Sequence, residues 1–365
     1  MIYLDYNATT PILPQARDAM IEAFGCLGNP SSVHTHGRNA RKNLENAREQ
    51  VASYFCVPAR NVIFTSGATE ANNTILKGFE GQVFVSAVEH DSVLNIRKDA
   101  LITPVDSNGI VDLEALENQL CTKKEPALVC VIAVNNETGA IQPIEEVLQI
   151  CKSNNAHLHV DAAQAVGKIS LNWNQLSSFT ISAHKFGGPK GIGALIINGS
   201  LQLNTLIQGG GQERSLRAGT ENIIGAIGMG AALTAPQFNW ETIISLQQHL
   251  EKNLLEICPE AIIFAKKAQR VFNTTAVAMP GTLSEVQLMH FDLNSISVSS
   301  GAACSSGKVK TSHVLKAMGV SDELSKCALR ISYGWNTTEE DINQCIAAWA
   351  SLFEIQNQKD RVRYA

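Results

Sequence analysis

The chain has 365 residues, of which 45% are hydrophobic and 17% are charged, so it can bury a large core, and its length suggests about two domains. Its 29 basic and 34 acidic side chains give a net charge of −5, which excludes a generally basic nucleic-acid-binding protein. No apolar run is long enough for a membrane span, and the chain does not begin with a basic segment followed by an apolar stretch. We therefore expect no membrane partner and no signal peptide.

The first part of the chain combines helical patterns with short β-rich runs. One apolar stripe predicts a helix over residues 37–55, and from about residue 60 to 200 the β-rich runs alternate with helical spacers. The runs are Val62–Thr65, Val83–Ser86, Leu128–Val134, His157–Val160, Phe179–Ser182 and Ala194–Ile197. Several are apolar on both faces, which is typical of a parallel sheet covered by helices, so this part is predicted to be an α/β domain.

The last part has a different pattern. A helix is expected over residues 240–257, followed by strand-like segments at 271–279, 296–299 and 328–333. A final helix is expected over 338–353, capped by Thr337 and Glu340 and followed by a polar tail over 356–365. We therefore predict a large α/β domain over residues 15–254 and a small α+β domain formed by residues 1–14 and 255–365.

Lys185 directly follows a β-rich run and precedes a glycine-rich turn. Ligands of α/β sheets bind beyond the carboxyl ends of strands, and a partly desolvated lysine there can lose its proton and form a Schiff base. A surface lysine beside a turn is the alternative interpretation.

Two further strand ends carry candidate residues. Asp161 ends a run and suits the protonated ring nitrogen of pyridoxal phosphate (PLP), although it could equally cap the next helix. His90 follows another run and could stack on a flat ring or move a proton, or be a structural histidine. The stretch Ser66–Asn72 follows a third run and opens a helix, which favours either an anion site or ordinary capping.

The nine cysteines are odd in number and form no C-x-x-C pair. This predicts free thiols in a reducing compartment, the cytoplasm, with neither a disulfide framework nor a metal site. Cys304 lies in the small-residue stretch Ser299–Gly307, which predicts an exposed loop, whereas Cys130 and Cys345 have apolar neighbours. Cys304 is therefore the candidate nucleophile.

Arginines mark two more candidate anion sites. Gly209–Thr220 combines glycines, two arginines and a hydroxyl, and suits a phosphate or carboxylate, or else forms a solvated turn. Arg330 lies within a β-rich run and needs an anionic partner, which a substrate carboxylate or a structural Asp or Glu could supply.

Taken in order, these motifs resemble the cysteine desulfurases of the NifS/IscS type, which are fold-type I PLP enzymes of the class V aminotransferase group. The resemblance covers nearly the whole chain and is carried by segments that extend from Tyr3–Pro11 to Ser299–Ser306. The others are Gly28–Ser32, Ser66–Glu70, Asn135–Gly139, Asp161–Gln164, Ser182–Lys185 and Gly209–Thr220. It implies a large domain with a mainly parallel seven-stranded sheet covered by helices, and a smaller α+β domain that carries Cys304.

The resemblance also implies site roles. Lys185 would carry PLP and shuttle a proton, Asp161 would pair with the ring nitrogen, and His90 would stack on the ring. The ring's phenolic oxygen would contact Gln164 and Asn136, and its phosphate would contact Ala68, Thr69, Ser182 and His184. Thr220 would reach the phosphate of the neighbouring subunit in a homodimer. Arg330 would bind the carboxylate of L-cysteine, and Cys304 would carry the persulfide.

The implied activity is a sulfurtransferase reaction that converts L-cysteine to L-alanine and supplies sulfur for Fe–S cluster assembly or another thiolation pathway. A sulfur-acceptor protein, either a scaffold or a carrier, is the implied partner. Selenocysteine lyase or another class V PLP enzyme is the alternative interpretation, and a catalytically idle PLP-fold binding module is the third. The short polar tail makes a scaffold-docking C-terminal region look abbreviated.

Overall fold

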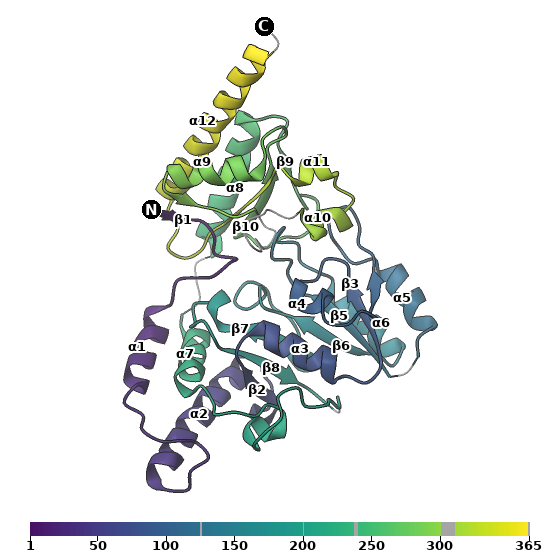
Figure 1. Ribbon diagram of the computed structural model, residues 1–365, viewed down its shortest axis with the longest axis vertical. Coiled ribbons are helices and arrows are strands. Elements are labelled where there is room, and N and C mark those ends of the chain that lie inside the picture. The colour runs from purple at the N-terminus through teal and green to yellow at the C-terminus, as the bar shows by residue number, and fades with distance from the viewer. Residues whose placement is uncertain (125, 200, 237–239, 301–310, 364–365) are drawn as a thin grey trace.

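The computed structural model describes residues 1–124, 126–199, 201–236, 240–300 and 311–363, which form a large sheet-based part and a smaller part (Figure 1). The large part has one sheet of seven strands in the order β2-β8-β7-β6-β5-β3-β4. These strands are β2 (Val62–Thr65), β3 (Gln82–Ser86), β4 (Leu101–Thr103), β5 (Ala127–Ile132), β6 (His157–Asp161), β7 (Ser178–Ser182) and β8 (Gly193–Ile197). Only the pairings of β8, with β2 and β7, are antiparallel in this sheet, so the predicted mainly parallel seven-stranded sheet is confirmed.

Helices cover both faces of this sheet. They are α1 (Pro14–Ala23), α2 (Thr35–Tyr54), α3 (Ala68–Gly78), α4 (Asp91–Leu94), α5 (Leu113–Cys121), α6 (Ile144–Ser153) and α7 (Ile223–Thr234). Because side chains alternate along a strand, Phe64 packs on the face with α2, α6 and α7, while its neighbour Ile63 packs on the face with α3. Helices therefore shield both faces of the sheet from solvent, which explains why several strands have apolar residues at consecutive positions.

The smaller part has its own apolar cluster, in which Leu250, Phe291 and Trp349 are fully buried. Its elements are β1 (Ile2–Tyr3), α8 (Trp240–Ile257), β9 (Ile262–Ile263), β10 (Thr274–Ala278), α9 (Ser284–Leu293), β11 (Ile296–Ser297), α10 (His313–Ala317), α11 (Asp322–Ser325), β12 (Ala328–Ser332) and α12 (Glu339–Arg363). The apolar face of α8 packs in this cluster together with Leu4. These contacts agree with a small domain that includes the N-terminus. They also put α8 in the smaller part, whereas the predicted large domain extends to residue 254, so that boundary lies near the C-terminal end of a helix that packs in the smaller part.

The C-terminal helix corrects the expectation of a polar tail. It continues to Arg363 and projects beyond the rest of the molecule (Figure 1). Residues 354–363 contain no glycine or proline and are mostly good helix formers, so intrinsic helix propensity continues the helix beyond Phe353. The capping box is also one residue later than expected. The Thr338 hydroxyl accepts from the backbone N–H of Asp341, and the Asp341 carboxylate accepts from the backbone N–H of Thr338.

The remaining described elements are four short 3-10 helices, labelled η1 (Ala59–Asn61), η2 (Trp173–Gln175), η3 (Ala183–Lys185) and η4 (Gln212–Ser215). Among the described residues, no helix is both long enough and apolar enough to cross a membrane.

Candidate active site

A cleft of about 940 Å³ lies at the carboxyl ends of the parallel strands. Asp161 is the last residue of β6, Asn136 follows β5, and Lys185 ends η3 directly after β7. Loops that follow parallel strands meet at one edge of the sheet, which explains why residues so far apart in the sequence share one cleft. The sequence-predicted residues that line it are Ala68, Thr69, His90, Asn136, Asp161, Gln164, Ser182, His184, Lys185 and Arg330.

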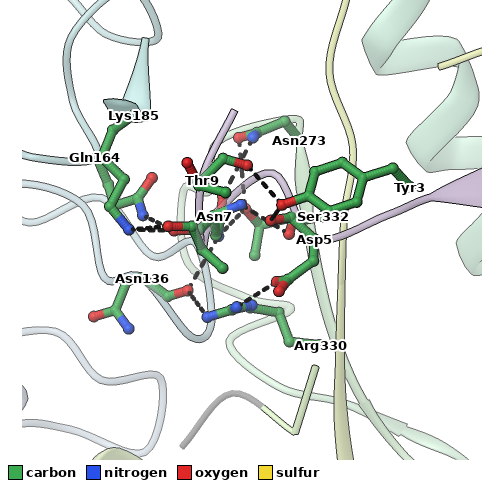
Figure 2. Close-up of polar contacts among 12 residues, drawn as sticks. Tyr3, Asp5, Asn7, Thr9, Asn136, Gln164, Lys185, Asn273, Arg330 and Ser332 are labelled. Atoms are coloured by element: carbon green, nitrogen blue, oxygen red, sulfur yellow. Dashed lines mark hydrogen bonds and ion pairs between the residues drawn. The ribbon is translucent and has the colours of Figure 1, made fainter. Parts of the chain in front are cut away.

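The Lys185 amine is held by the N-terminal segment. Its Nζ donates to the backbone oxygens of Asn7 (2.6 Å) and Ala8 (2.9 Å), as Figure 2 shows for Asn7. Burial, reinforced by the Arg330 cation, lowers the pKa of Lys185 to about 8, although Asp5 and Asp161 oppose the shift. A sizeable fraction of this amine is therefore neutral near physiological pH, as a nucleophilic lysine requires.

Gln164 is oriented by bonds at both ends of its amide. Its Nε2 donates to the backbone oxygen of Asn7 at 2.8 Å, and its Oε1 accepts from Lys168 Nζ at 2.7 Å. Burial, followed by the neighbouring cations Lys185 and Arg330, lowers the pKa of Lys168 to about 7. The sequence analysis assigned no role to Lys168, although its spacing of four residues from Gln164 could have indicated the contact between the two side chains.

The Asp161 carboxylate is buried and bonded on both oxygens. Oδ1 accepts from the backbone N–H of Ala163 at 3.0 Å, and Oδ2 accepts from Asn72 Nδ2 at 2.8 Å. Asn72 lies on α3 and is fully buried. The sequence placed Asn72 at the end of a possible anion-binding motif, whereas the structure turns its side chain inward to Asp161.

One end of the cleft is built from small groups and N–H donors. Gly67 precedes α3 with φ of +154°, a conformation that favours glycine. A Cβ added to Gly193 would lie 2.8 Å from the Gly67 Cα, so the two backbones approach as closely as glycine allows. The N-terminus of α3, with Ala68 and Thr69, therefore opens onto the cleft beside Ser182, as an anion site requires.

His184 lines the same end of the cleft. Its Nδ1 lies 3.2 Å from the Thr9 hydroxyl. Burial, followed by the charges of Lys185 and Lys190, lowers the pKa of His184 to about 4. The ring is therefore neutral near physiological pH and would meet an anion as a hydrogen-bonding group.

Arg330 pairs with a structural carboxylate in this structure. Its Nη2 lies 2.7 Å from Asp5 Oδ1, and its Nη1 donates to the Asn136 backbone oxygen at 3.1 Å (Figure 2). Its Nε is buried without a hydrogen-bond partner among the described residues. The structural alternative for Arg330 is thus observed, while its binding of a substrate carboxylate stays a prediction.

His90 forms the N-cap of α4. Its Nδ1 accepts from the backbone N–H of Ser92 at 3.0 Å and lies 2.8 Å from the Ser92 hydroxyl. The preceding Glu89 is fully buried, and burial, followed by the charge of Asp161, raises the pKa of its carboxyl well above the usual range. The sequence analysis assigned no role to Glu89, because nothing in the stretch Val83–His90 marks this carboxyl as buried.

Two predicted residues remain, Thr220 and Cys304. Thr220 is exposed and is not among the residues that line the cleft of its own chain. Cys304 lies outside the described residues. On either side of it, Ser299 and Thr311 line the cleft, and the nearby Ser312 hydroxyl donates to the buried Glu137 carboxylate at 2.5 Å.

The donor set of the cleft fits PLP. It combines an amine of lowered pKa, a buried carboxylate, a helix N-terminus with hydroxyl groups for a phosphate, and a histidine beside them. Lys185 would hold the aldehyde carbon, Asp161 the ring nitrogen, and Ala68, Thr69, Ser182 and His184 the phosphate.

Comparisons with known proteins agree with this chemistry. Residues 2–345 match the family Aminotransferase class-V. "Cysteine desulfurase IscS" of Dictyoglomus turgidum is 36% identical over 97% of this chain and 94% of its own. The structure of a NifS-like protein from Rickettsia africae superposes with a TM-score of 0.89 at 37% identity, covering 97% of this chain and 99% of that one.

A further structure, SspA in complex with cysteine, has a TM-score of 0.78 at 28% identity and covers 93% of this chain and all of its own. Matches of this length and identity leave no large segment of the fold unaccounted for. The chain therefore belongs to the class V aminotransferases, a family of PLP-dependent enzymes, and within that family to the cysteine desulfurases of the NifS/IscS type.

Proposed function

We propose that Lys185, Asp161 and Cys304 perform the desulfurase reaction of this chain, with Cys304 as the group that accepts the substrate sulfur. The observation that carries the proposal is that the Lys185 amine and the Asp161 carboxylate line one cleft from adjacent parallel strands, β7 and β6. When bound there, PLP supplies an electron sink for the bond that breaks at the substrate α-carbon.

The chain's own residues prepare the substrate. Lys185, with its pKa lowered to about 8, takes and returns the proton at the α-carbon. Arg330 binds the cysteine carboxylate and gives up or shares its contact with Asp5. Gln164 and Asn136 orient the ring through its phenolic oxygen, and His90 packs on its face.

Cys304 then forms the persulfide. Its thiolate attacks the substrate sulfur, so that an S–S bond forms as the C–S bond breaks, and the electron pair stays on the carbon that becomes the methyl group of L-alanine. Ser299 and Thr311 both line the cleft, and Cys304 is within a few residues of each. An extended chain covers about 3.4 Å per residue, so the segment between these two residues is long enough for Cys304 to reach the cleft.

The assembly is proposed to be a homodimer. Thr220 is exposed and stands apart from the cleft of its own chain, as expected of a residue that reaches the PLP phosphate of a neighbouring subunit. We further propose that the enzyme works in the cytoplasm and passes sulfur to an acceptor protein for Fe–S cluster assembly or another thiolation pathway.

Product analysis tests the proposal. Incubation with L-cysteine and a reductant is expected to give alanine and sulfide in equal amounts, whereas pyruvate and ammonia would indicate a lyase. Cys304→Ser is expected to abolish sulfide release while the visible absorbance of bound PLP remains. Full sulfide production by this variant would overturn the persulfide role.

A matched control is Cys56→Ser, which removes an exposed thiol elsewhere on the surface and should retain activity. The Cys304→Ser and Cys56→Ser variants also test the alternative activity, that of a selenocysteine lyase. If Cys304→Ser releases selenium from L-selenocysteine at the unmodified rate but no sulfide from L-cysteine, the thiol is specific to the sulfur reaction.

A further inference from the structure

A buried chain of hydrogen bonds connects the Asp161 carboxylate with the His90 ring. Asn72, which is fully buried on α3, donates from Nδ2 to Asp161 Oδ2 at 2.8 Å and to Ser92 Oγ at 2.9 Å. The Ser92 hydroxyl in turn lies 2.8 Å from His90 Nδ1. Both His90 and Asp161 line the cleft, while Asn72 does not.

The direction of each bond in this chain can be derived. An ionised carboxylate only accepts, so the amide of Asn72 must turn its NH₂ group toward Asp161. The second hydrogen of that group then goes to Ser92 Oγ, and the Ser92 hydrogen is directed to the remaining neighbour, His90 Nδ1. This nitrogen also accepts from the backbone N–H of Ser92 at 3.0 Å, so it carries no hydrogen.

The other side of Asn72 supports the same orientation. Its Oδ1 lies 3.1 Å from His159 Nε2, and His159 Nδ1 lies 2.9 Å from the Ser178 hydroxyl. Burial lowers the pKa of His159 to about 4, so this ring is neutral and can donate from only one nitrogen. Donation from Nε2 to Asn72 and acceptance from Ser178 at Nδ1 satisfy every group.

We propose that Asn72 is a positioning residue that, through Ser92, couples Asp161 to His90 and fixes His90 in the tautomer with its hydrogen on Nε2. Any proton that His90 exchanges with the cleft is then exchanged at Nε2. The catalytic meaning of this coupling rests on the proposed roles of His90 and Asp161, whereas the tautomer itself is a property of the protein alone.

The tautomer is measured by two-bond ¹H–¹⁵N correlation spectra of the PLP-loaded protein labelled with ¹⁵N-histidine. His90 is assigned by the signal that disappears in His90→Gln. We expect its Nδ1 to show the shift of an unprotonated nitrogen and its Nε2 that of a protonated one. A protonated Nδ1, or an even mixture of tautomers, would overturn the proposal.

Two variants test the coupling, and each can stand alone if the other fails to fold. Ser92→Ala and Asn72→Leu each weaken or remove the bond from the Ser92 hydroxyl to His90 Nδ1, but leave the bond from the Ser92 backbone N–H in place. Each is therefore expected to move the His90 shifts part of the way toward those of a tautomer mixture. Each is expected to lower kcat about tenfold, the effect of one lost hydrogen bond, with a smaller change in KM. Because both break the same chain, the double variant should lose no more than the more severe single variant.

Asn73→Leu is the matched control, since this half-buried neighbour on α3 bonds only to the helix backbone at Thr69 among the contacts described. Its His90 shifts and kcat are expected to equal those of the unmodified protein. Additive losses in the double variant, or unchanged His90 shifts in both single variants, would contradict the coupling. Because the shifts are read without turnover, they remain informative even if the chain shows no desulfurase activity.

Discussion

Lys185 and Gln164 donate to the same acceptor, the backbone oxygen of Asn7, at 2.6 and 2.8 Å (Figure 2). Asn7 is itself fixed, because its Nδ2 donates to the Asn136 backbone oxygen at 3.0 Å and to the Thr274 hydroxyl at 2.9 Å. The N-terminal segment therefore sets the positions of two side chains proposed to hold the cofactor.

The lowered pKa of Lys185 predicts how PLP attachment depends on pH. The rate of covalent attachment to PLP-free protein should rise about tenfold per pH unit below 8 and level off above it, because only the neutral amine reacts. The Arg330→Gln variant removes a cation that lowers the pKa of Lys185, so its plateau should begin at a higher pH. An unchanged midpoint in Arg330→Gln, followed by absorbance, would contradict this account.

Lys168 is expected to support PLP binding through Gln164. Lys168→Met removes the donor to Gln164 Oε1, which frees the amide to rotate and should weaken PLP affinity by about tenfold. The affinity is measured by spectroscopic titration of PLP-free protein. Lys152→Met, which removes a surface bond to Gln175, serves as the control and should leave the affinity unchanged.

Acid should destabilise the protein through His159. The pKa of about 4 in the folded protein lies below the ordinary histidine pKa of 6.5, so the unfolded state binds more protons as pH falls below 6.5. The free energy of unfolding should therefore fall by up to about 1.4 kcal/mol per pH unit between 6.5 and 4 from this group. Urea unfolding at several pH values measures it, and His159→Gln should show a shallower slope.

The buried pair Arg48–Glu213 should contribute strongly to stability. Both side chains are almost fully buried, and the carboxylate accepts two guanidinium bonds at 2.7 and 2.8 Å. Glu213→Gln leaves the partly exposed Glu45 as the remaining anionic partner of the buried Arg48 among the described residues, so the free energy of unfolding should fall by about 3 kcal/mol. Asp18→Asn breaks the exposed pair with Arg17 and should cost less than about 1 kcal/mol in the same denaturant melts.

The Arg48–Glu213 pair also holds an unusual backbone. Glu213, Arg214 and Ser215 all have φ between 44° and 62°, a region that side chains rarely adopt. Glu213 Oε2 additionally accepts from the backbone N–H of Phe64 at 2.9 Å, which ties this segment to β2. Loss of the pair should therefore also disturb the nearby Thr220.

Sequence patterns predicted six of the seven strands of the large sheet because those strands are buried on both faces. They did not predict β4, whose Leu101 and Ile102 are exposed. They placed Asp161 and Lys185 at strand ends because parallel strands present their carboxyl ends to one edge. They did not predict the partners of these residues. Asn72 reads as part of a helix start, and its inward direction depends on how α3 packs over β6 and β7.

The full length of the C-terminal helix was not predicted, for a different reason. Residues beyond Phe353 lack an apolar stripe, so periodicity indicated a tail, whereas intrinsic helix propensity continued the helix to Arg363. Likewise, β1 and β11 have two residues each, which is too short for any alternating pattern to appear. Their pairing depends on contacts between segments almost 300 residues apart.

The same pairing affects how the protein can mature during synthesis. Ile2 and Tyr3 pair with Ile296 and Ser297, Asp5 pairs with Arg330, and the backbone N–H of Asn7 donates to the Ser332 hydroxyl. Residues 2–7 therefore cannot make these contacts until the ribosome has translated residues 296–332. A nascent chain that ends before residue 296 lacks the partners that hold the N-terminal segment, so the contact of Asn7 with the Lys185 amine forms only late in synthesis.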